Sequence, residues 1–253
     1  MKTKLSVLLA LFFASTILAQ LQPISYLDKE QKLTGFVSYP KKKIKSTVSV
    51  LILPAWMGID AHAKETAIEL SYLGYKTFIA DIYGDGNNPT STKEAGQKAG
   101  FYKKNIYEYQ KRIQLAIDEL IKQGADSNNI VVMGYCFGGT GAIEAARSNS
   151  NVKGVVSFHG GLSRDDKRVI EPIKAKILIL HGADDPYVPE AEIKLFQTEM
   201  RTAKADWQMV YYANAVHAFT DKNAGTDTTK GAAYNELAEK RSWIALLQFL
   251  KEF

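Results

Sequence analysis

Short apolar segments alternate along this chain with longer segments in which apolar residues recur at helical spacing. The short segments have the length and composition of strands and lie at residues 34–39, 47–53, 76–81, 130–133, 152–158, 176–181 and 207–212. The longer segments predict helices over residues 61–73, 101–122, 140–147, 191–200 and 234–250. This alternation predicts an α/β fold with a mostly parallel central sheet and helices on both of its faces.

Two connections differ from the rest. Residues 84–100 are polar and rich in glycine, and they predict a loop after the strand at 76–81. The basic run at 41–45 lies between the first two predicted strands, and we expect a solvated hairpin tip there rather than a polyanion site. Because ligands of such sheets bind at the carboxyl ends of the strands, the residues that follow each strand are the candidates for chemistry.

The first 19 residues have a different pattern. A basic start with Lys2 and Lys4 leads into an apolar centre and then into small residues that end at Ala19. This order predicts an export signal that is cleaved after Ala19. A retained membrane anchor is the alternative, and the apolar centre is short for a spanning helix. We expect residues 20–253 to form one α/β domain in the periplasm or outside the cell, with no other contact with a membrane.

Composition narrows the functional classes. Hydrophobic residues make up 46% of the chain and charged residues 23%, as in folded globular proteins. Without Lys2 and Lys4 the formal net charge falls from +5 to +3, which is too small for a nucleic-acid-binding surface. Cys136 is the only cysteine, so no intrachain disulfide forms, and an exported chain with one free thiol either buries it or uses it.

Cys136 lies in the most informative motif. Four β-forming residues end at Gly134, the cysteine follows at a corner, and residues beyond Gly139 have helical spacing. Such an elbow exposes a nucleophile, and small neighbours are needed because the corner is strained and closely packed. The helix N-terminus favours thiolate over thiol and lowers the pKa of Cys136. Taken alone, the motif leaves open an inert, buried cysteine.

Acidic and imidazole side chains follow two later strands. Asp184 and Asp185 come directly after one strand, and His217 comes after the next. The chain order of nucleophile, acid and base is that of α/β hydrolases. We expect Cys136 to attack a carbonyl carbon, His217 to carry the proton and Asp185 to hold the imidazole, with Asp184 as the alternative acid.

The sequence gives weaker evidence that the other three histidines have a catalytic role. His159 and His181 each end a strand, and we expect both to be structural residues near the site. His62 opens a polar helix and is expected at the surface. No two histidines have zinc-site spacing, and the glycines after Cys136 form neither a dinucleotide fingerprint nor a P-loop. We therefore predict no metal and no cofactor.

Three segments together resemble the dienelactone hydrolase family. They are Gly134–Gly139 around the cysteine, Gly182–Pro189 around the acids, and Val216–Phe219 around the histidine. The resemblance covers nearly all of the chain after residue 19. It implies a three-layer α/β hydrolase fold and a small-molecule ester or lactone as substrate, and it leaves the oligomeric state open.

The resemblance also implies roles for particular residues. It assigns the triad of the family to Cys136, Asp185 and His217. It further implies an oxyanion hole formed by two backbone N–H groups, which by position are those of Trp56 and Phe137. The product would be released from a covalent acyl-enzyme.

Three positions depart from the pattern of the family's best-known enzymes. A glutamate that helps to ionise the thiol is replaced here by Ala55, so activation must depend on His217 and the helix terminus. Two arginines that hold a substrate carboxylate are replaced by Asp85 and Asp221. Since like charges repel strongly in a desolvated site, we expect a substrate that is not a dicarboxylate, and neutral esters to react faster than anionic ones.

The remaining pocket is expected to be aromatic. Trp56, Tyr83 and Tyr135 flank strand ends, and the 84–100 segment is expected to cover them in part, although core packing is an equal alternative for these rings. Two functional alternatives also stay open. The missing acid at Ala55 motivates an inactive binding module with the same fold, and the single thiol motivates a redox sensor, against which the lack of a resolving cysteine counts.

Overall fold

The computed structural model describes residues 21–41 and 47–253, so the predicted export signal and most of the basic run at 41–45 lie outside the described residues. The strands are β1 (Gln22–Asp28), β2 (Gln31–Ser38), β3 (Ser49–Leu53), β4 (Lys76–Ile79), β5 (Ile130–Tyr135), β6 (Gly154–Phe158), β7 (Lys176–Gly182) and β8 (Trp207–Tyr212). The helices are α2 (Ala61–Leu73), α3 (Thr92–Lys104), α4 (Ile106–Lys122), α5 (Phe137–Arg147), α6 (Glu190–Thr202) and α7 (Glu236–Leu250). Two 3₁₀ turns, η1 (Lys222–Ala224) and η2 (Thr228–Lys230), precede α7.

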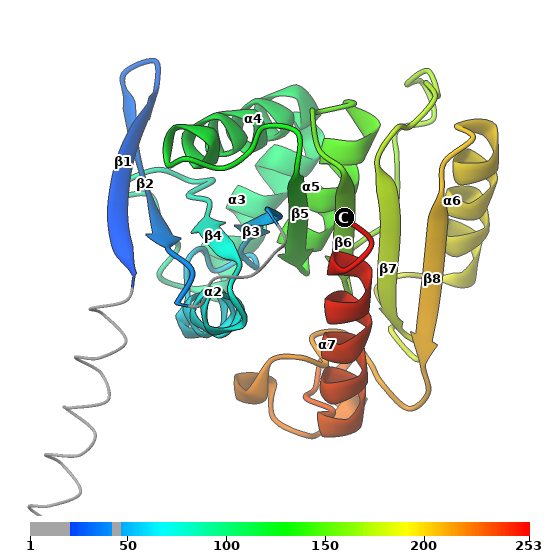
Figure 1. Cartoon of the computed structure of the whole chain (residues 1–253). Coiled ribbons are helices and arrows are strands. Elements are labelled where there is room, and N and C mark those ends of the chain that lie inside the picture. Colours follow the sequence, from blue (N-terminus) through cyan, green and yellow to red (C-terminus); the bar gives the residue numbers. More distant parts are fainter. Residues whose placement is uncertain (1–20, 42–46) are drawn as a thin grey trace, which may run out of the picture.

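All eight of these strands form one sheet in the order β1-β2-β4-β3-β5-β6-β7-β8 (Figure 1). The pairs β1–β2 and β2–β4 are antiparallel, and every pair from β4 to β8 is parallel. The predicted fold class, an α/β fold with a mostly parallel central sheet, is confirmed. Because β3 and β5 are central and covered on both sides, every residue in them is buried, which explains their continuous apolar runs.

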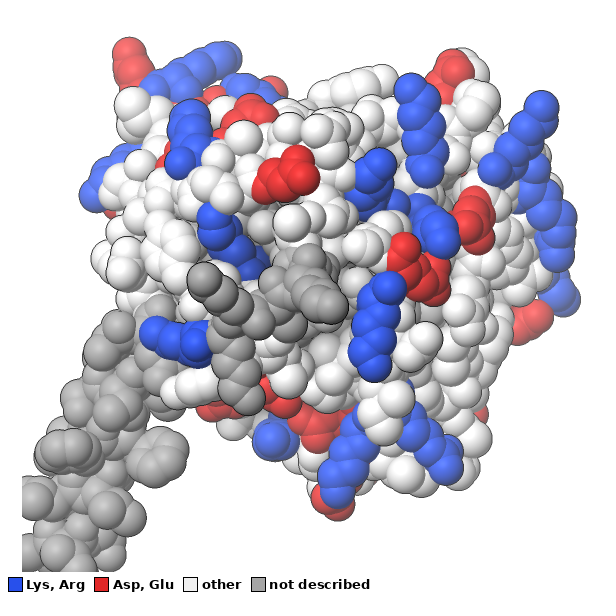
Figure 2. All heavy atoms as spheres, in the orientation of Figure 1, with Lys and Arg blue, Asp and Glu red and all other residues white. Residues whose placement is uncertain are grey.

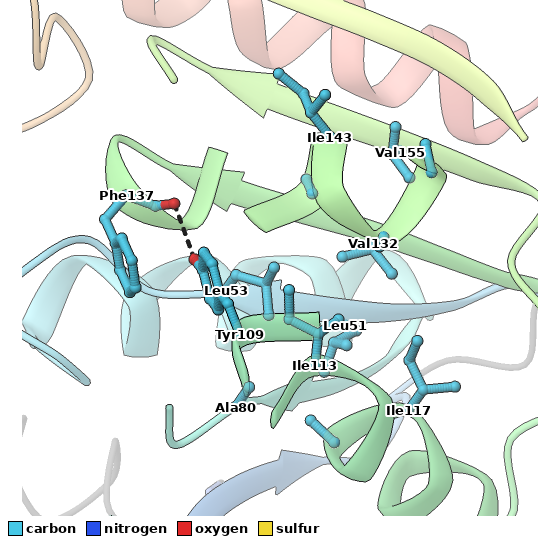
Figure 3. Close-up of a cluster of buried hydrophobic side chains, with 14 of the residues drawn as sticks. Leu51, Leu53, Ala80, Tyr109, Ile113, Ile117, Val132, Phe137, Ile143 and Val155 are labelled. Carbon is cyan, nitrogen blue, oxygen red and sulfur yellow. Dashed lines mark hydrogen bonds between the residues drawn. The ribbon is translucent and has the colours of Figure 1, made fainter. Parts of the chain in front are cut away.

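Helices cover both faces of the sheet. Residues of α3, α4, α5 and α6 share one hydrophobic cluster with the sheet, and residues of α2 and α7 share the other (Figure 1). In the first cluster the Tyr109 ring stacks on the Phe137 ring at 4.5 Å between centroids, and the Tyr109 hydroxyl donates to the Phe137 carbonyl at 2.9 Å (Figure 3). This contact fixes the first turn of α5, which follows the elbow.

The local sequence explains where the helices begin and end. The Asp60 side chain accepts from the Ala63 N–H at the start of α2, and Gly74 ends that helix with a left-handed φ of 101°. The Ser91 side chain caps α3 in the same way by accepting from the Glu94 N–H. Asn105 then separates α3 from α4.

Three predictions about the connections are corrected by the structure. The glycine-rich segment at 84–100 is not all loop, because it contains the first part of α3. The single helix predicted over 101–122 is two helices, the end of α3 and the whole of α4. The hairpin expected between β2 and β3 is wrong, because β4 lies between those strands in the sheet. The edge strand β1 was not predicted, since its alternating residues lack a continuous apolar run.

The described part of the chain has a surface of mixed charge. In the described ranges 21–41 and 47–253, no helix is both long and apolar enough to cross a bilayer. On the face shown in Figure 2, lysine and arginine side chains are interspersed with aspartate and glutamate.

Candidate active site

Cys136 stands at the sharp turn between β5 and α5. Its backbone has φ 53° and ψ −112°, a strained conformation for a residue with a side chain. Glycines make this turn possible, because a Cβ at Gly134 would lie 2.1 Å from the Gly138 oxygen and a Cβ at Gly138 would lie 2.1 Å from the Leu53 oxygen. Cys136 itself is partly buried.

Two hydrogen bonds connect three side chains from three separate segments. His217 Nε2 lies 3.0 Å from Cys136 Sγ, and His217 Nδ1 lies 2.9 Å from Asp185 Oδ2. Asp185 follows β7 and His217 follows β8, while Cys136 follows β5. Three parallel strands thus bring the three groups together at the carboxyl edge of the sheet, as their positions after strands predict.

Neighbouring groups shift the pKa values of Cys136 and His217 in opposite directions. Burial acts to raise the pKa of Cys136, but the hydrogen bond and charge of His217, with smaller contributions from Lys103 and the Phe137 N–H, hold it below the ordinary value of 9.0. Burial acts to lower the pKa of His217, but its hydrogen bonds to Asp185 and Cys136 raise it to about 10. The two shifts act in the direction of a thiolate–imidazolium pair.

The two neighbouring acids have different environments. Asp185 is buried, and its other oxygen accepts from the Tyr187 N–H at 2.9 Å, whereas Asp184 is exposed. Of these two acids, Asp185 alone has a hydrogen bond to His217 within the described residues. The Tyr187 ring also lies edge-on to His217 at 5.3 Å, a contact that the sequence analysis did not anticipate.

The two backbone N–H groups predicted to form the oxyanion hole lie in different segments of the chain. The Phe137 N–H begins α5 and acts on the sulfur. The Trp56 N–H lies in the turn after β3 and has no acceptor within the described part of the chain. The Trp56 carbonyl accepts from the Tyr83 hydroxyl at 2.8 Å, which fixes this turn against the segment after β4.

Part of the expected aromatic wall is present. Trp56 is 38% exposed, whereas Tyr83 is only 5% exposed and its ring stacks with that of Phe137 at 5.8 Å. The 84–100 segment reaches this wall, because a Cβ at Gly96 would lie 3.9 Å from the Trp56 ring. Trp56 is therefore the member of this group with the most surface available to a ligand.

The other three pocket candidates lie elsewhere or are already engaged. Tyr135 is buried, and its hydroxyl is 3.2 Å from the Thr66 hydroxyl on the α2 side of the sheet. Asp85 forms an ion pair with Lys32 at 3.0 Å. Asp221 accepts from the Asn223 N–H at the start of η1, and with Tyr135 it lines a cavity of about 440 Å³ bordered by α2 and α7.

The remaining three histidines are all at least partly buried. His159 and His181 are each 2% exposed, in agreement with their expected structural role. The surface position expected for His62 is wrong, because it is half-buried with its ring 4.4 Å from the Tyr135 ring. In the described ranges, no three His, Cys, Asp or Glu side chains are grouped closely enough to hold a metal ion.

A cleft lies beside the first turns of α5. Its volume is about 1020 Å³, and its wall includes Lys103 at the end of α3, Thr140 and Gly161. Lys103 also contributes to lowering the pKa of Cys136. A helical pattern alone could not identify Lys103, because its proximity to the thiol depends on how α3 packs.

The fold and the elbow define an α/β hydrolase. Residues 33–253 match the model of the dienelactone hydrolase family. The chain belongs to the dienelactone hydrolase family and is therefore a hydrolase of the ester and lactone type. The resemblance drawn from three short segments is thus confirmed over most of the chain.

Several known proteins are similar over most of their length. A solved dienelactone hydrolase-like promiscuous phosphotriesterase from metagenomic libraries is 33% identical with a TM-score of 0.86, over 92% of this chain and 97% of that one. A probable 2-oxo-3-(5-oxofuran-2-ylidene)propanoate lactonase from Bradyrhizobium sp is 25% identical over 80% of this chain and 83% of that protein. A putative carboxymethylenebutenolidase from Escherichia coli (strain K12) is 20% identical over 87% and 83%.

Proposed function

We propose that this hydrolase cleaves an ester, lactone or thioester with Cys136 as nucleophile, His217 as proton carrier and Asp185 as the carboxylate that orients His217. The proposal is carried by the hydrogen bonds of 3.0 Å and 2.9 Å that His217 makes with the other two side chains. The favoured thiolate state of Cys136 and cationic state of His217 support the same assignment.

The reaction would proceed in two stages. The Cys136 thiolate attacks the carbonyl carbon, and the carbonyl π electrons move to oxygen, where the Trp56 and Phe137 N–H groups would donate to the oxyanion. The oxyanion collapses, the alkoxide or thiolate leaves with the proton of His217, and the acyl group stays on sulfur. Neutral His217 then takes a proton from water, the hydroxide attacks the thioester, and the thiolate leaves as the acid product is released.

Activation in this proposal does not need a glutamate at the position of Ala55. The hydrogen bond from His217 to the sulfur and the start of α5 both favour the thiolate, and Lys103 adds a positive charge. Ala55 packs against the apolar cluster on the α2 and α7 face and offers no charge to the site.

We propose a substrate that is not a dicarboxylate. By sequence position, Asp85 and Asp221 replace two arginines that hold a substrate carboxylate in the family's best-known enzymes, and neither offers a positive charge. The similar proteins are named as a promiscuous phosphotriesterase, a probable lactonase and a putative carboxymethylenebutenolidase, so their names do not point to one substrate. A neutral ester or lactone fits the residues that this chain carries.

Hydrolysis of a chromogenic short-chain ester tests the reaction. Wild type and Cys136→Ala would be compared at equal concentration, with Ser148→Ala as a control for a hydroxyl at the far end of α5. We expect turnover by wild type and the control, and only background hydrolysis by Cys136→Ala. Equal, background rates for all three would favour a binding module that keeps the fold without the reaction.

Substrate charge is tested with a matched pair of esters. One ester is neutral, and the other carries a carboxylate on its acyl part. We expect a higher kcat/KM for the neutral ester. Faster turnover of the anionic ester would show that a cation such as Lys103 holds the carboxylate in place of the missing arginines.

We also propose that the chain is exported and that its first 19 residues are removed. The support is the sequence pattern of a basic start, an apolar centre and small residues before Ala19. Cell fractionation of a bacterial host, followed by intact-mass measurement, tests the proposal. Recovery outside the cytoplasm with Gln20 as first residue is expected, and a full-length cytoplasmic or membrane-bound chain would contradict it.

A further inference from the structure

We propose that His159 is a positioning residue: its buried ring, held by Thr220, supports the His217 imidazole in the orientation that reaches Cys136. This inference rests on the proposed function, in which His217 serves Cys136, and adds a residue that the triad does not include. His159 touches neither the thiol nor Asp185 among the described contacts.

His159 is held in a strained backbone conformation next to the site. It directly follows β6 and has a φ of 39°, which a residue with a side chain rarely adopts. Its N–H still donates to the Leu180 oxygen at 2.9 Å, so the strand pairing continues up to this residue. Strain of this kind persists only where surrounding contacts determine it, and it is concentrated at functional sites.

The contacts of His159 reach two of the segments that build the site. Its ring lies 5.2 Å from the His217 ring at an interplanar angle of 65°, and 5.1 Å from the Phe219 ring at 81°. On the other side it lies 6.1 Å from the ring of Tyr135, the residue before Cys136. His159 therefore fills the space between the segment that carries the base and the strand that carries the thiol.

The hydrogen bond to Thr220 ties the base-carrying segment to the sheet. His159 Nε2 lies 2.9 Å from the Thr220 hydroxyl, and Thr220 is 3% exposed. His217 lies three residues earlier in an irregular stretch where Ala218 has a φ of 56°, so regular secondary structure does not fix its position. A buried hydrogen bond on Thr220 limits how far this stretch and the His217 ring can move.

The charge state of His159 suits a neighbour of an imidazolium. Burial lowers the pKa of His159 well below its ordinary value, and the charges of His217, His62 and His181 act in the same direction. A neutral ring packs against protonated His217 without charge repulsion. The Nδ1 atom of His159 has no hydrogen-bond partner among the described residues, so the hydrogen bond at Nε2 is the one that fixes the ring.

Substitutions on both sides of the hydrogen bond test the proposal. His159→Phe keeps an aromatic ring and removes the bond, whereas Thr220→Val removes the hydroxyl and keeps the shape. His159→Gln retains a donor that can reach Thr220. Thr198→Val is the matched control. Thr198 is an exposed residue of α6, and the substitution also removes one hydroxyl hydrogen bond, to the Lys194 oxygen at 2.9 Å.

Three readouts separate positioning from mere stability. They are kcat and KM for a neutral chromogenic ester, the pH dependence of Cys136 alkylation by iodoacetamide, and the free energy of unfolding in urea. We expect His159→Phe and Thr220→Val to lower kcat roughly 10- to 100-fold with KM within about twofold, because small misplacements of a catalytic group have effects of this size. The alkylation profile should shift to higher pH, with partial recovery in His159→Gln and none of these changes in Thr198→Val.

Two results would overturn the proposal. One is a kcat and an alkylation profile equal to wild type in both His159→Phe and Thr220→Val when these variants are folded. The other is a loss of kcat with an unchanged alkylation profile, because a displaced His217 must change the thiol. Absence of Cys136-dependent hydrolysis in wild type would instead defeat the proposed function, and the alkylation profiles would still report on His159.

Discussion

At the scale of single residues, Cys136 combines a strained backbone with a thiol whose pKa is lowered. The strain comes from the turn between β5 and α5, and the lowered pKa comes from His217 overcoming the effect of burial. Both features depend on contacts between segments far apart in sequence. The elbow motif could be read from the sequence, but the 3.0 Å contact with His217 Nε2 could not.

The pH dependence of thiol alkylation tests this coupling. In wild type the apparent pKa of Cys136 should lie below 9.0, the ordinary pKa of a thiol, because cationic His217, with a pKa of about 10, stabilises the thiolate. In His217→Ala the pKa of Cys136 should rise to 9.0 or above, because burial is no longer outweighed. Iodoacetamide rates measured across pH report both values, and superimposable profiles would contradict the ion pair.

Asp185 and Asp184 offer a matched pair of substitutions. Asp185→Asn removes the charge that stabilises protonated His217, and we expect kcat to fall by about 10²- to 10⁴-fold, the size of a general acid–base contribution. Asp184→Asn changes an exposed neighbour and should leave kcat within about twofold. Ester hydrolysis by the two variants measures this difference, and the reverse result would move the acid to Asp184.

At the scale of elements, the central strands and most helices could be predicted from the sequence. The bounds of α2 and β8 agree with the predicted ranges of 61–73 and 207–212, since a clear apolar pattern and a terminating glycine or turn mark them. β1 and the start of α3 could not be predicted, because an exposed edge strand and a helix of low hydrophobicity lack such a pattern. The position of β4 between β2 and β3 depends on tertiary packing, which the local pattern of apolar residues does not determine.

Packing of α5 against β3 is tested by adding one methyl group. Gly138→Ala would place a Cβ 2.1 Å from the Leu53 oxygen, so backbone must move and the free energy of unfolding should fall by about 3 kcal/mol. In Gly100→Ala, within α3, the new Cβ would have no atom within 4 Å, so the free energy of unfolding should rise by about 0.5–1 kcal/mol. Urea denaturation measures both, and an unchanged stability of Gly138→Ala would contradict the close packing of the elbow.

At the scale of the whole molecule, one buried ionic network joins separate elements. Arg147 on α5 donates to Glu144 on the same helix at 2.8 Å and to Glu199 on α6 at 2.7 Å. Its guanidinium also donates to the carbonyls of Leu162 and Ser163 at 2.7 Å and 3.0 Å. Because the Arg147 side chain is only 3% exposed, removing it leaves two buried carboxylates short of a partner.

Arg147→Met should destabilise the molecule strongly. The expected loss is about 3–5 kcal/mol in the free energy of unfolding, as for other broken buried pairs. Lys240→Met is the control, because Lys240 pairs with Glu236 at the surface, where solvent screens the pair, and its loss should leave stability nearly unchanged. Urea denaturation compares the two variants, and similar small losses would show that the network contributes little to holding α5 and α6 together.

In the proposed reaction, the acyl group of the substrate is transferred to the sulfur of Cys136. Acid quenching of wild type during turnover of an activated ester, followed by peptide mass mapping, detects this intermediate. One added acyl group is expected on the peptide that contains Cys136, and none in Cys136→Ala. Turnover with an unmodified Cys136 peptide, or an acyl group on another residue, would show that Cys136 is not the nucleophile.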